Sequence, residues 1–295
     1  MRASVCILVA VLGGPACYGT YGGDQRQPLM SESLVPSSSH IGVMAPRTAR
    51  RAAWTGEDLM NLGGPVIPES TVYAIWWGDR SRFPGDAMSG LDAFLSGLDR
   101  STYLAIADQY VGRPARATFL GHILEPSAPP DHSPATEEIV SKVCQVLSEA
   151  QQTPSATALY LVFTDNFPQQ NDFCAWHDSG KCPNGYRIHV AYLPNVQSAT
   201  GCDPGDLFQC NQFGEGTRAL ANVTAHEVME MITDPEGTGW VDRQGEEIAD
   251  KCAWTFGKCV ALGSTQWQLQ KEWSNADHGC VQEKNAASRN VAVWR

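Results

Sequence analysis

The sequence predicts a single α/β or α+β domain with a mixed sheet, stapled by disulfides. Three observations support this prediction: strand and helix patterns alternate along the chain, eight of its ten cysteines lie between residues 144 and 280, and its length fits one folded unit. Domains usually hold ~100 to 200 residues, so the 295 residues fit one large domain with extended ends. We expect that domain to span residues 61–284, with a linker or pro-segment at 18–60 and a tail at 285–295.

The composition is that of a globular protein. Subtracting 32 Asp and Glu from 21 Lys and Arg leaves a formal net charge of −11, whereas a nucleic-acid partner requires a basic face. Charged residues make up 18% and apolar residues 43% of the chain, which excludes a disordered or coiled-coil protein. We therefore expect no nucleic-acid partner.

The N-terminus is typical of a secretory signal peptide, which we assign to residues 1–17. Arg2 precedes the apolar run Val5–Leu12, which is too short to span a bilayer and is followed by small residues. Gly14-Pro15-Ala16-Cys17 loosely resembles a bacterial lipobox, in which Cys17 would carry an N-terminal lipid anchor. No later segment is apolar for long enough to form a transmembrane helix. We expect an extracellular protein or one on the cell-envelope surface.

The first half of the domain begins with a strand. Thr71–Gly78 is rich in β-branched and aromatic residues and ends at glycine. Apolar residues at three- and four-residue steps predict a helix over Asp86–Leu98. A second helix is expected over Thr102–Tyr110, and weak alternation predicts a strand over Ala117–Leu124.

Three further elements precede the chemically interesting part of the chain. Thr136 is expected to cap a helix with Glu137 and Glu138 in its first turn. The apolar run Ala158–Thr164 is typical of a strand covered on both faces. Arg187–Leu193 alternates in polarity, which predicts an edge or half-exposed strand.

Eight cysteines remain once Cys6 and Cys17 are set aside. An even number in an exported chain predicts disulfides. The easiest local loops to close join Cys174 to Cys182 and Cys202 to Cys210, although the spacing leaves the pairing open. No Cys-x-x-Cys pair of the zinc-ribbon type is present, so these cysteines are interpreted as staples and not as ligands.

A helix over Thr217–Thr233 carries the candidate chemistry, and a following proline disfavours helix beyond it. His226 and Glu230 are four residues apart and therefore project from one face, where two ligands can share a metal. Glu227 is placed to take a proton from metal-activated water. The motif predicts a divalent metal, zinc first, although a carboxylate in place of a second histidine lets manganese, iron or calcium compete.

The acidic segment after this helix offers the third metal ligand. Glu247 and Asp250 follow Glu230 by 17 and 20 residues, and the choice between them stays open. Asp234, just past the helix, and His278 are expected to support the ligands without binding the metal themselves. His278 would reach them if Cys280 were bonded to Cys252 or Cys259.

Two other interpretations apply to the same part of the chain. The acidic loop can instead bind calcium through Asp242, Gly245 and Glu247, or be merely solvated. His177 and His189 are interpreted as structural residues, because the first lies inside the predicted Cys174–Cys182 loop and the second on the predicted edge strand.

The chain resembles two families. The His226-Glu227-x-x-Glu230 helix looks like the active-site helix of zincin metallopeptidases, which implies a zincin-like domain. Other segments are similar to the EXORDIUM or phosphate-induced protein family of secreted plant proteins, which implies an extracellular, cell-wall-associated protein. These segments are Gly63-Gly64-Pro65, Val72–Gly78, Tyr160–Thr164, Phe173-Cys174 and Thr233-Asp234-Pro235.

Two functional hypotheses follow. The first is a secreted metal-dependent hydrolase of the metallopeptidase type, acting on a peptide or protein with Glu227 as general base. The second is a non-catalytic extracellular module of the EXORDIUM type that binds a cell-wall component or a surface partner. In that case Trp76 and Trp77 are expected to be core residues, because neighbours on a strand face opposite sides.

Overall fold

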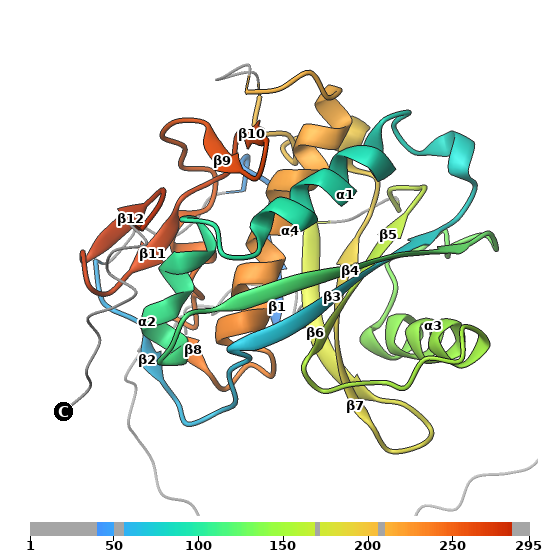
Figure 1. Ribbon diagram of the computed structural model, residues 1–295, viewed down its shortest axis with the longest axis horizontal. Coiled ribbons are helices and arrows are strands. Elements are labelled where there is room, and N and C mark those ends of the chain that lie inside the picture. Colours follow the sequence, from blue (N-terminus) through green and yellow to red (C-terminus); the bar gives the residue numbers. More distant parts are fainter. Residues whose placement is uncertain (1–39, 50–55, 169–171, 206–209, 285–295) are drawn as a thin grey trace, which may run out of the picture. The chain divides into compact units, whose positions relative to one another are not determined.

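The computed structural model describes residues 40–49, 56–168, 172–205 and 210–284. They form a mixed α/β structure around a six-stranded sheet in the order β1-β6-β7-β5-β3-β4, which confirms the predicted class (Figure 1). The strands are β1 (Gly42–Met44), β3 (Glu69–Trp77), β4 (Arg116–Glu125), β5 (Ala158–Thr164), β6 (Ala175–Lys181) and β7 (Arg187–Leu193). β7, β5, β3 and β4 run parallel, whereas β6 is antiparallel to both β7 and β1.

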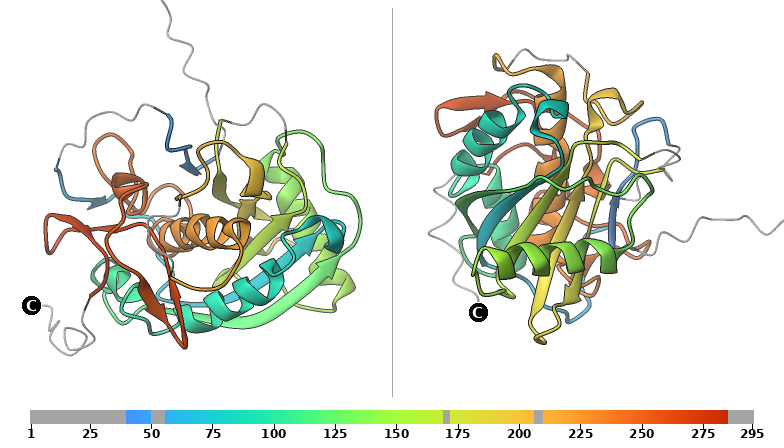
Figure 2. Two further views of the ribbon diagram at one scale, coloured as in Figure 1. Left: turned by 90° about the horizontal axis from the view of Figure 1, so that it is seen from above. Right: turned by 90° about the vertical axis from the view of Figure 1, so that its right-hand side faces the viewer.

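Helices cover both faces of this sheet. They are α1 (Ala87–Leu98), the single turn α2 (Asp108–Val111), α3 (Thr136–Glu149) and α4 (Glu215–Thr233). Three short two-stranded sheets accompany them: β2 (Met60–Asn61) with β8 (Trp240–Val241), β9 (Val260–Leu262) with β10 (Thr265–Trp267), and β11 (Glu272–Ser274) with β12 (Gly279–Val281). The last two pairs are hairpins of the C-terminal segment (Figures 1 and 2).

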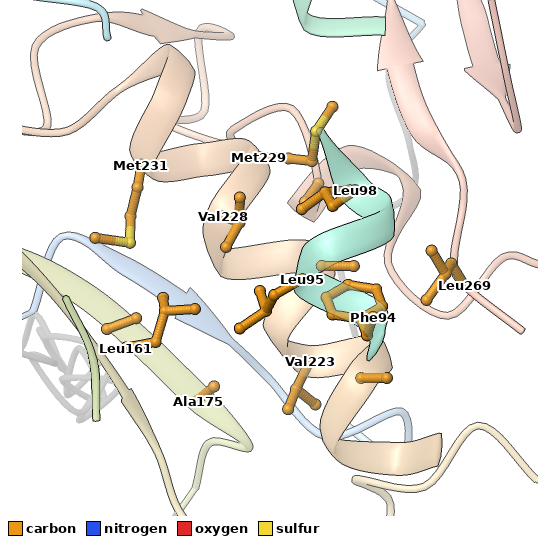
Figure 3. Packing of buried hydrophobic residues seen from close by; sticks show 14 of the residues in the cluster. Phe94, Leu95, Leu98, Leu161, Ala175, Val223, Val228, Met229, Met231 and Leu269 are labelled. Atoms are coloured by element: carbon orange, nitrogen blue, oxygen red, sulfur yellow. The ribbon is translucent and has the colours of Figure 1, made fainter. Parts of the chain in front are cut away.

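The two faces of the sheet belong to two separate apolar clusters. On one face α3 packs alone, burying Ile139, Val143 and Leu147 against the β5 and β7 side chains. On the other face α4 lies on the sheet and α1 lies on α4, so that α4 is covered from both sides (Figure 3). Trp76 and Trp77 are buried in opposite clusters, as predicted for neighbours on a strand.

Most predicted elements are confirmed with shifts of one or two residues. The strand at 158–164 is buried at every position, and α1, α3, β3 and β4 lie where expected. Thr136 is the first residue of α3 and not its cap; Ala135 precedes it, and the Ala135 amide donates to Oε2 of Glu138 at 2.9 Å. The helix expected over Thr102–Tyr110 is divided into a 3-10 turn, Leu104–Ala107, and α2.

The expectation of an edge or half-exposed strand over Arg187–Leu193 was wrong. β7 lies between β5 and β6 and is buried at six of its seven positions. It is not an edge strand, because β6 and then β1 extend the sheet beyond it. Its alternate residues lie in the two apolar clusters on the two faces of the sheet, so neither face is open to solvent. The polar residue His189 is consequently buried on the α4 face, 3.6 Å from Glu236.

Part of the segment expected to be a linker or pro-segment belongs to the fold. Gly42–Met44 forms the outermost strand β1, pairing Gly42 with His177. The expected signal peptide, the lipobox at Cys17 and the tail at 285–295 lie outside the described residues.

Four disulfides staple the domain, and neither expected local loop is among them. The bonds join Cys144 to Cys182, Cys174 to Cys202, Cys210 to Cys259 and Cys252 to Cys280. Cys174 and Cys182 lie at opposite ends of the extended strand β6, ~26 Å apart at about 3.3 Å per residue, whereas a disulfide needs Cα atoms within ~7 Å. The disulfides indicate an oxidising compartment. Within the described residues, no helix has the length and apolarity needed to cross a membrane.

Candidate metal centre

The centre is built on α4, a helix that is buried almost all round. Seventeen of its 19 residues are buried, because the sheet covers one side while α1 and the C-terminal segment cover the other (Figures 1 and 3). His226, Glu227 and Glu230 therefore have no exposed surface. Burying such groups is costly unless they are paired or bind a metal, so their surroundings decide what they do.

His226 faces two carboxylates through one ring nitrogen. Its Nε2 lies 3.1 Å from Oε1 of Glu230, one helical turn later, and 3.7 Å from Oδ1 of Asp250. Its Nδ1 lies 3.1 Å from the side-chain nitrogen of Gln270, which also donates to the Ala249 carbonyl. Turning this amide by 180° would bring its oxygen to Nδ1 of His226, at the cost of the hydrogen bond to the Ala249 carbonyl.

His177 reaches the same carboxylates from the sheet. Trp176 packs on the α3 side of β6, so its neighbour His177 points to the α4 side. Its Nδ1 lies 3.3 Å from Oε2 of Glu227 and 3.5 Å from Oε2 of Glu230. Its Nε2 lies 3.2 Å from the carbonyl of Asp234 and 3.7 Å from Oε2 of Glu247. We interpreted His177 as structural; the structure instead places it in the cluster.

Both proposed third ligands reach the cluster, but each meets a different histidine. Asp250 lies by His226, and its amide donates to Oε1 of Glu230 at 3.1 Å. Glu247 lies by His177. Two groups of three ligand atoms lie within 4.8 Å of one another, namely His226, Glu230 and Asp250, and His177, Glu230 and Glu247. The Cys252–Cys280 bond fixes the loop that carries both acids.

The two residues expected to support the ligands behave differently. The carbonyl of Asp234 accepts from His177, while its carboxylate, just past the end of α4, accepts from the amides of Thr238 and Gly239 at 2.7 Å. His278 lies on an exposed turn and pairs with Asp58 at 2.9 Å. The Cys252–Cys280 bond forms as required, yet the turn between β11 and β12 directs His278 to solvent.

Two of the three oxygen donors expected for the calcium alternative, Asp242 and Glu247, face other groups. The carboxylate of Asp242 pairs with Lys251 at 2.8 Å and accepts from the amides of Gln244 and Glu246. Glu247 points toward His177 and not toward Asp242. The loop is therefore held together by its own contacts.

Burial and mutual charge shift the titration of the cluster. Burial disfavours the imidazolium form, but the carboxylates of Glu230, Glu227 and Asp250 together outweigh it and raise the pKa of His226 to about 10. For Glu230, burial by itself would raise the pKa, yet the two nearby histidines hold this pKa below its ordinary value. Burial raises the pKa of Glu227, and burial together with the charge of Glu230 raises that of Glu247.

Several buried atoms of the cluster have no hydrogen-bond partner. They are Nε2 of His226, Oε1 of Glu227, Oε2 of Glu230 and Oε2 of Glu247. A tetrahedral zinc ion with bonds of ~2.1 Å separates its ligand atoms by about 3.4 Å, close to the 3.1 and 3.7 Å that separate Nε2 of His226 from Glu230 and Asp250. The histidine and carboxylate donors therefore fit a divalent cation.

Three neighbours of this cluster were not predicted from the sequence. Gln270 holds His226, and Glu272 accepts a 2.5 Å hydrogen bond from the hydroxyl of Tyr103, with burial raising the pKa of Glu272 well above its usual value. Gly42 of β1 forms one wall, where a Cβ atom would lie 2.0 Å from the ring of His177. No local pattern distinguishes these residues, because only the tertiary fold brings them to α4.

No protein-family model matches the chain, and no curated protein matches it. The resemblances to zincins and to the EXORDIUM family thus remain at the level of short motifs. The function has to be inferred from the geometry of the buried cluster.

Proposed function

We propose that this protein is a secreted metal-dependent hydrolase, with a zincin-like metallopeptidase activity on peptide or protein substrates. The supporting observation is the convergence of His226, Glu230 and Asp250, whose ligand atoms lie within 4.8 Å of one another in a buried site. Zinc is the cation that we expect, because an imidazole and carboxylates at these distances suit it. The cation would supply Lewis-acid polarisation of a carbonyl and lower the pKa of water.

Glu227 is the residue that we propose as general base. It follows His226 directly on α4, and its Oε1 has no partner while Oε2 faces His177. Burial raises its pKa, which is the direction that a general base needs. The ring of His177 would keep Glu227 in place, while Gln270 fixes the ring of His226.

Access to the centre is expected on the Asp250 side. The side chain of Asp250 is 14% exposed, whereas those of His226 and Glu230 have no exposure. The opposite side is closed by β1, where Gly42 lies against His177. A substrate carbonyl would therefore approach along the loop that carries Asp250.

The proposed location is the extracellular space or the cell-envelope surface. The four disulfides support it, since such bonds persist in oxidising compartments. The signal-peptide pattern at residues 1–17 supports it from the sequence.

The test is the Glu227→Gln variant, compared with Glu149→Gln on the exposed side of α3. Both would be assayed for metal content and for cleavage of a mixture of internally quenched peptides. We expect Glu227→Gln to keep its metal and lose ~100-fold to 10,000-fold in rate, as for loss of a general base. Glu149→Gln should match the wild type. Full activity of Glu227→Gln with retained metal would rule out the mechanism.

The burial of the cluster favours a second candidate, a non-catalytic extracellular module whose cation is purely structural. In that case the protein would bind a cell-wall glycan or a surface partner. Binding of wall polysaccharide that survives chelation, with no peptide cleavage, would support this candidate over the hydrolase.

A further inference from the structure

Glu230 is the one residue shared by both groups of ligand atoms. Its two oxygens face two different histidines: Oε1 lies 3.1 Å from Nε2 of His226, and Oε2 lies 3.5 Å from Nδ1 of His177. A single cation bound at His226 would leave Oε2 without a cation, in a position where it has no hydrogen-bond partner. Carboxylates that use both oxygens in this way commonly bridge two metal ions.

We propose that the centre binds two divalent cations bridged by Glu230, the first at His226 and Asp250 and the second at His177 and Glu247. The inference rests on the proposed function only in taking the first position as a metal site. The second position is formed from the sheet and the loop, and it adds His177 as a ligand that the helix motif alone does not include.

The orientation of His177 suits this role. A carbonyl oxygen can only accept a hydrogen bond, so Nε2 of His177 carries a proton toward the Asp234 carbonyl at 3.2 Å. In the neutral ring Nδ1 then presents its lone pair toward Glu230 and Glu227, and Glu247, which lies 3.7 Å from Nε2, would complete the position by turning its carboxylate toward Nδ1. A histidine ligand usually donates its other ring N–H to a carbonyl or carboxylate in this manner.

Charge balance also favours two cations. Four carboxylates surround the two imidazoles, from Glu227, Glu230, Glu247 and Asp250. With neutral histidine ligands and these four carboxylates ionised, one divalent cation leaves a charge of −2 among them, whereas two cations balance the four. Uncompensated buried charge is strongly unfavourable, so the second cation removes the imbalance that the first leaves.

The two positions differ in their access to solvent. The first opens through Asp250, which is 14% exposed. The second is enclosed, because His177 and Glu247 are 0% and 4% exposed and Gly42 closes the remaining side. We therefore assign reactivity to the first position, while the second fixes the bridge and exchanges its ion slowly.

The experiment uses the full mature chain, stripped of metal and titrated with Zn²⁺ or Co²⁺ alone. Bound ions are counted by elemental analysis, and the Co²⁺-loaded protein is examined by electron paramagnetic resonance. We expect two ions per chain and a signal weakened by coupling across Glu230. His177→Gln and Glu247→Gln should each bind one ion and give the full uncoupled signal of a single Co²⁺. Exposed His122 on β4, replaced by Gln, is the matched control and should bind two.

The outcomes separate this inference from the proposed function. One ion per chain in the wild type, unchanged in His177→Gln and Glu247→Gln, would overturn the second position and leave the hydrolase proposal intact. No bound ion in a folded wild-type protein would overturn both. Circular dichroism checks that each variant is folded, and the pair of variants from different segments covers the case in which one fails to fold.

Discussion

Two helices, α3 and α4, pack on opposite faces of the same sheet and use their acidic residues in opposite ways. α3 buries five of its 14 residues and leaves Glu137, Glu138 and Glu149 at the surface. α4 buries 17 of its 19 residues, including Glu227 and Glu230. The difference arises because α3 has one neighbour, the sheet, whereas α1 and the C-terminal segment cover α4 from the other side (Figure 2).

The surroundings of a helix decide whether its acidic side chains are solvated or must pair within the protein. A carboxylate on α3 is solvated and interchangeable with other polar groups, while one on α4 must find a partner within the protein. The same contrast recurs within β6, where Trp176 joins the apolar cluster under α3 and its neighbour His177 joins the polar cluster under α4.

The largest difference is expected between two variants that each remove one carboxylate, one on α4 and one on α3. Glu230→Gln should weaken metal binding by more than ~100-fold, because losing a mere supporting contact of a ligand already costs ~10-fold to 100-fold. Glu149→Gln on α3 should change it less than twofold. Competition with a chromophoric chelator measures both, and equal affinities in the two variants would erase the distinction between the helices.

The next largest effect concerns pH in the metal-free protein. The pKa of His226 is raised to about 10 from 6.5, so its stabilising contribution is complete below pH 6.5 and disappears as the pH rises to about 10. Glu247, whose pKa burial raises, acts in the same direction above pH 4.5. Urea unfolding with chelator at pH 6, 8 and 9.5 should show stability falling by a few kcal/mol, on the order that linkage gives for such shifts.

Bound metal should reverse this trend, since cations compete with protons for the same atoms. Saturating Zn²⁺ should therefore stabilise the protein more at pH 8 than at pH 6. A flat pH profile of the metal-free protein, or stabilisation by Zn²⁺ that decreases with pH, would contradict the shifts that burial on α4 produces.

A smaller effect is expected from β1, whose successive residues face the two sides of the sheet. Gly42→Ala places a Cβ atom 2.0 Å from His177 and should destabilise by about 1–3 kcal/mol through overpacking, with reduced metal content. Val43→Ala, on the α3 side, should leave metal content unchanged. Thermal unfolding and elemental analysis compare the two; full metal content in Gly42→Ala would show that β1 does not form a wall of the site.

The smallest effect is expected for His278→Ala. His278 is exposed and pairs only at the surface with Asp58, so stability should stay within ~0.5 kcal/mol and metal content should not change. A loss of metal in this variant would return His278 to the supporting role that the sequence suggested.

The elements set by local pattern were predictable from sequence. α1, α3 and β5 follow from the spacing of their apolar residues, and the one-turn separation of His226 and Glu230 follows from helix geometry. Glu247 and Asp250 also lay within the acidic segment that was expected to supply the third ligand, although the sequence could not choose between them. The structure shows why, since each lies beside a different histidine.

What depends on strand order was not predictable. β7 carries the alternation of a half-exposed strand, yet β6 and β1 lie outside it. His177 was missed because Ala-Trp-His-Asp-Ser-Gly-Lys has a weak strand signal and no ligand spacing with the helix. The expected disulfide between Cys174 and Cys182 was wrong for the same reason, because β6 separates these two cysteines although they are near in sequence.

The placement of two of these disulfides has a consequence for how the protein matures. Cys174 stands three residues before His177, and Cys252 stands two residues after Asp250, so the strand and the loop that complete the cluster are each tethered next to their key side chain. Reduction of these two bonds should therefore loosen both segments next to the cluster. We therefore expect the cluster to assemble, and to take up a cation, only once these cysteines are oxidised.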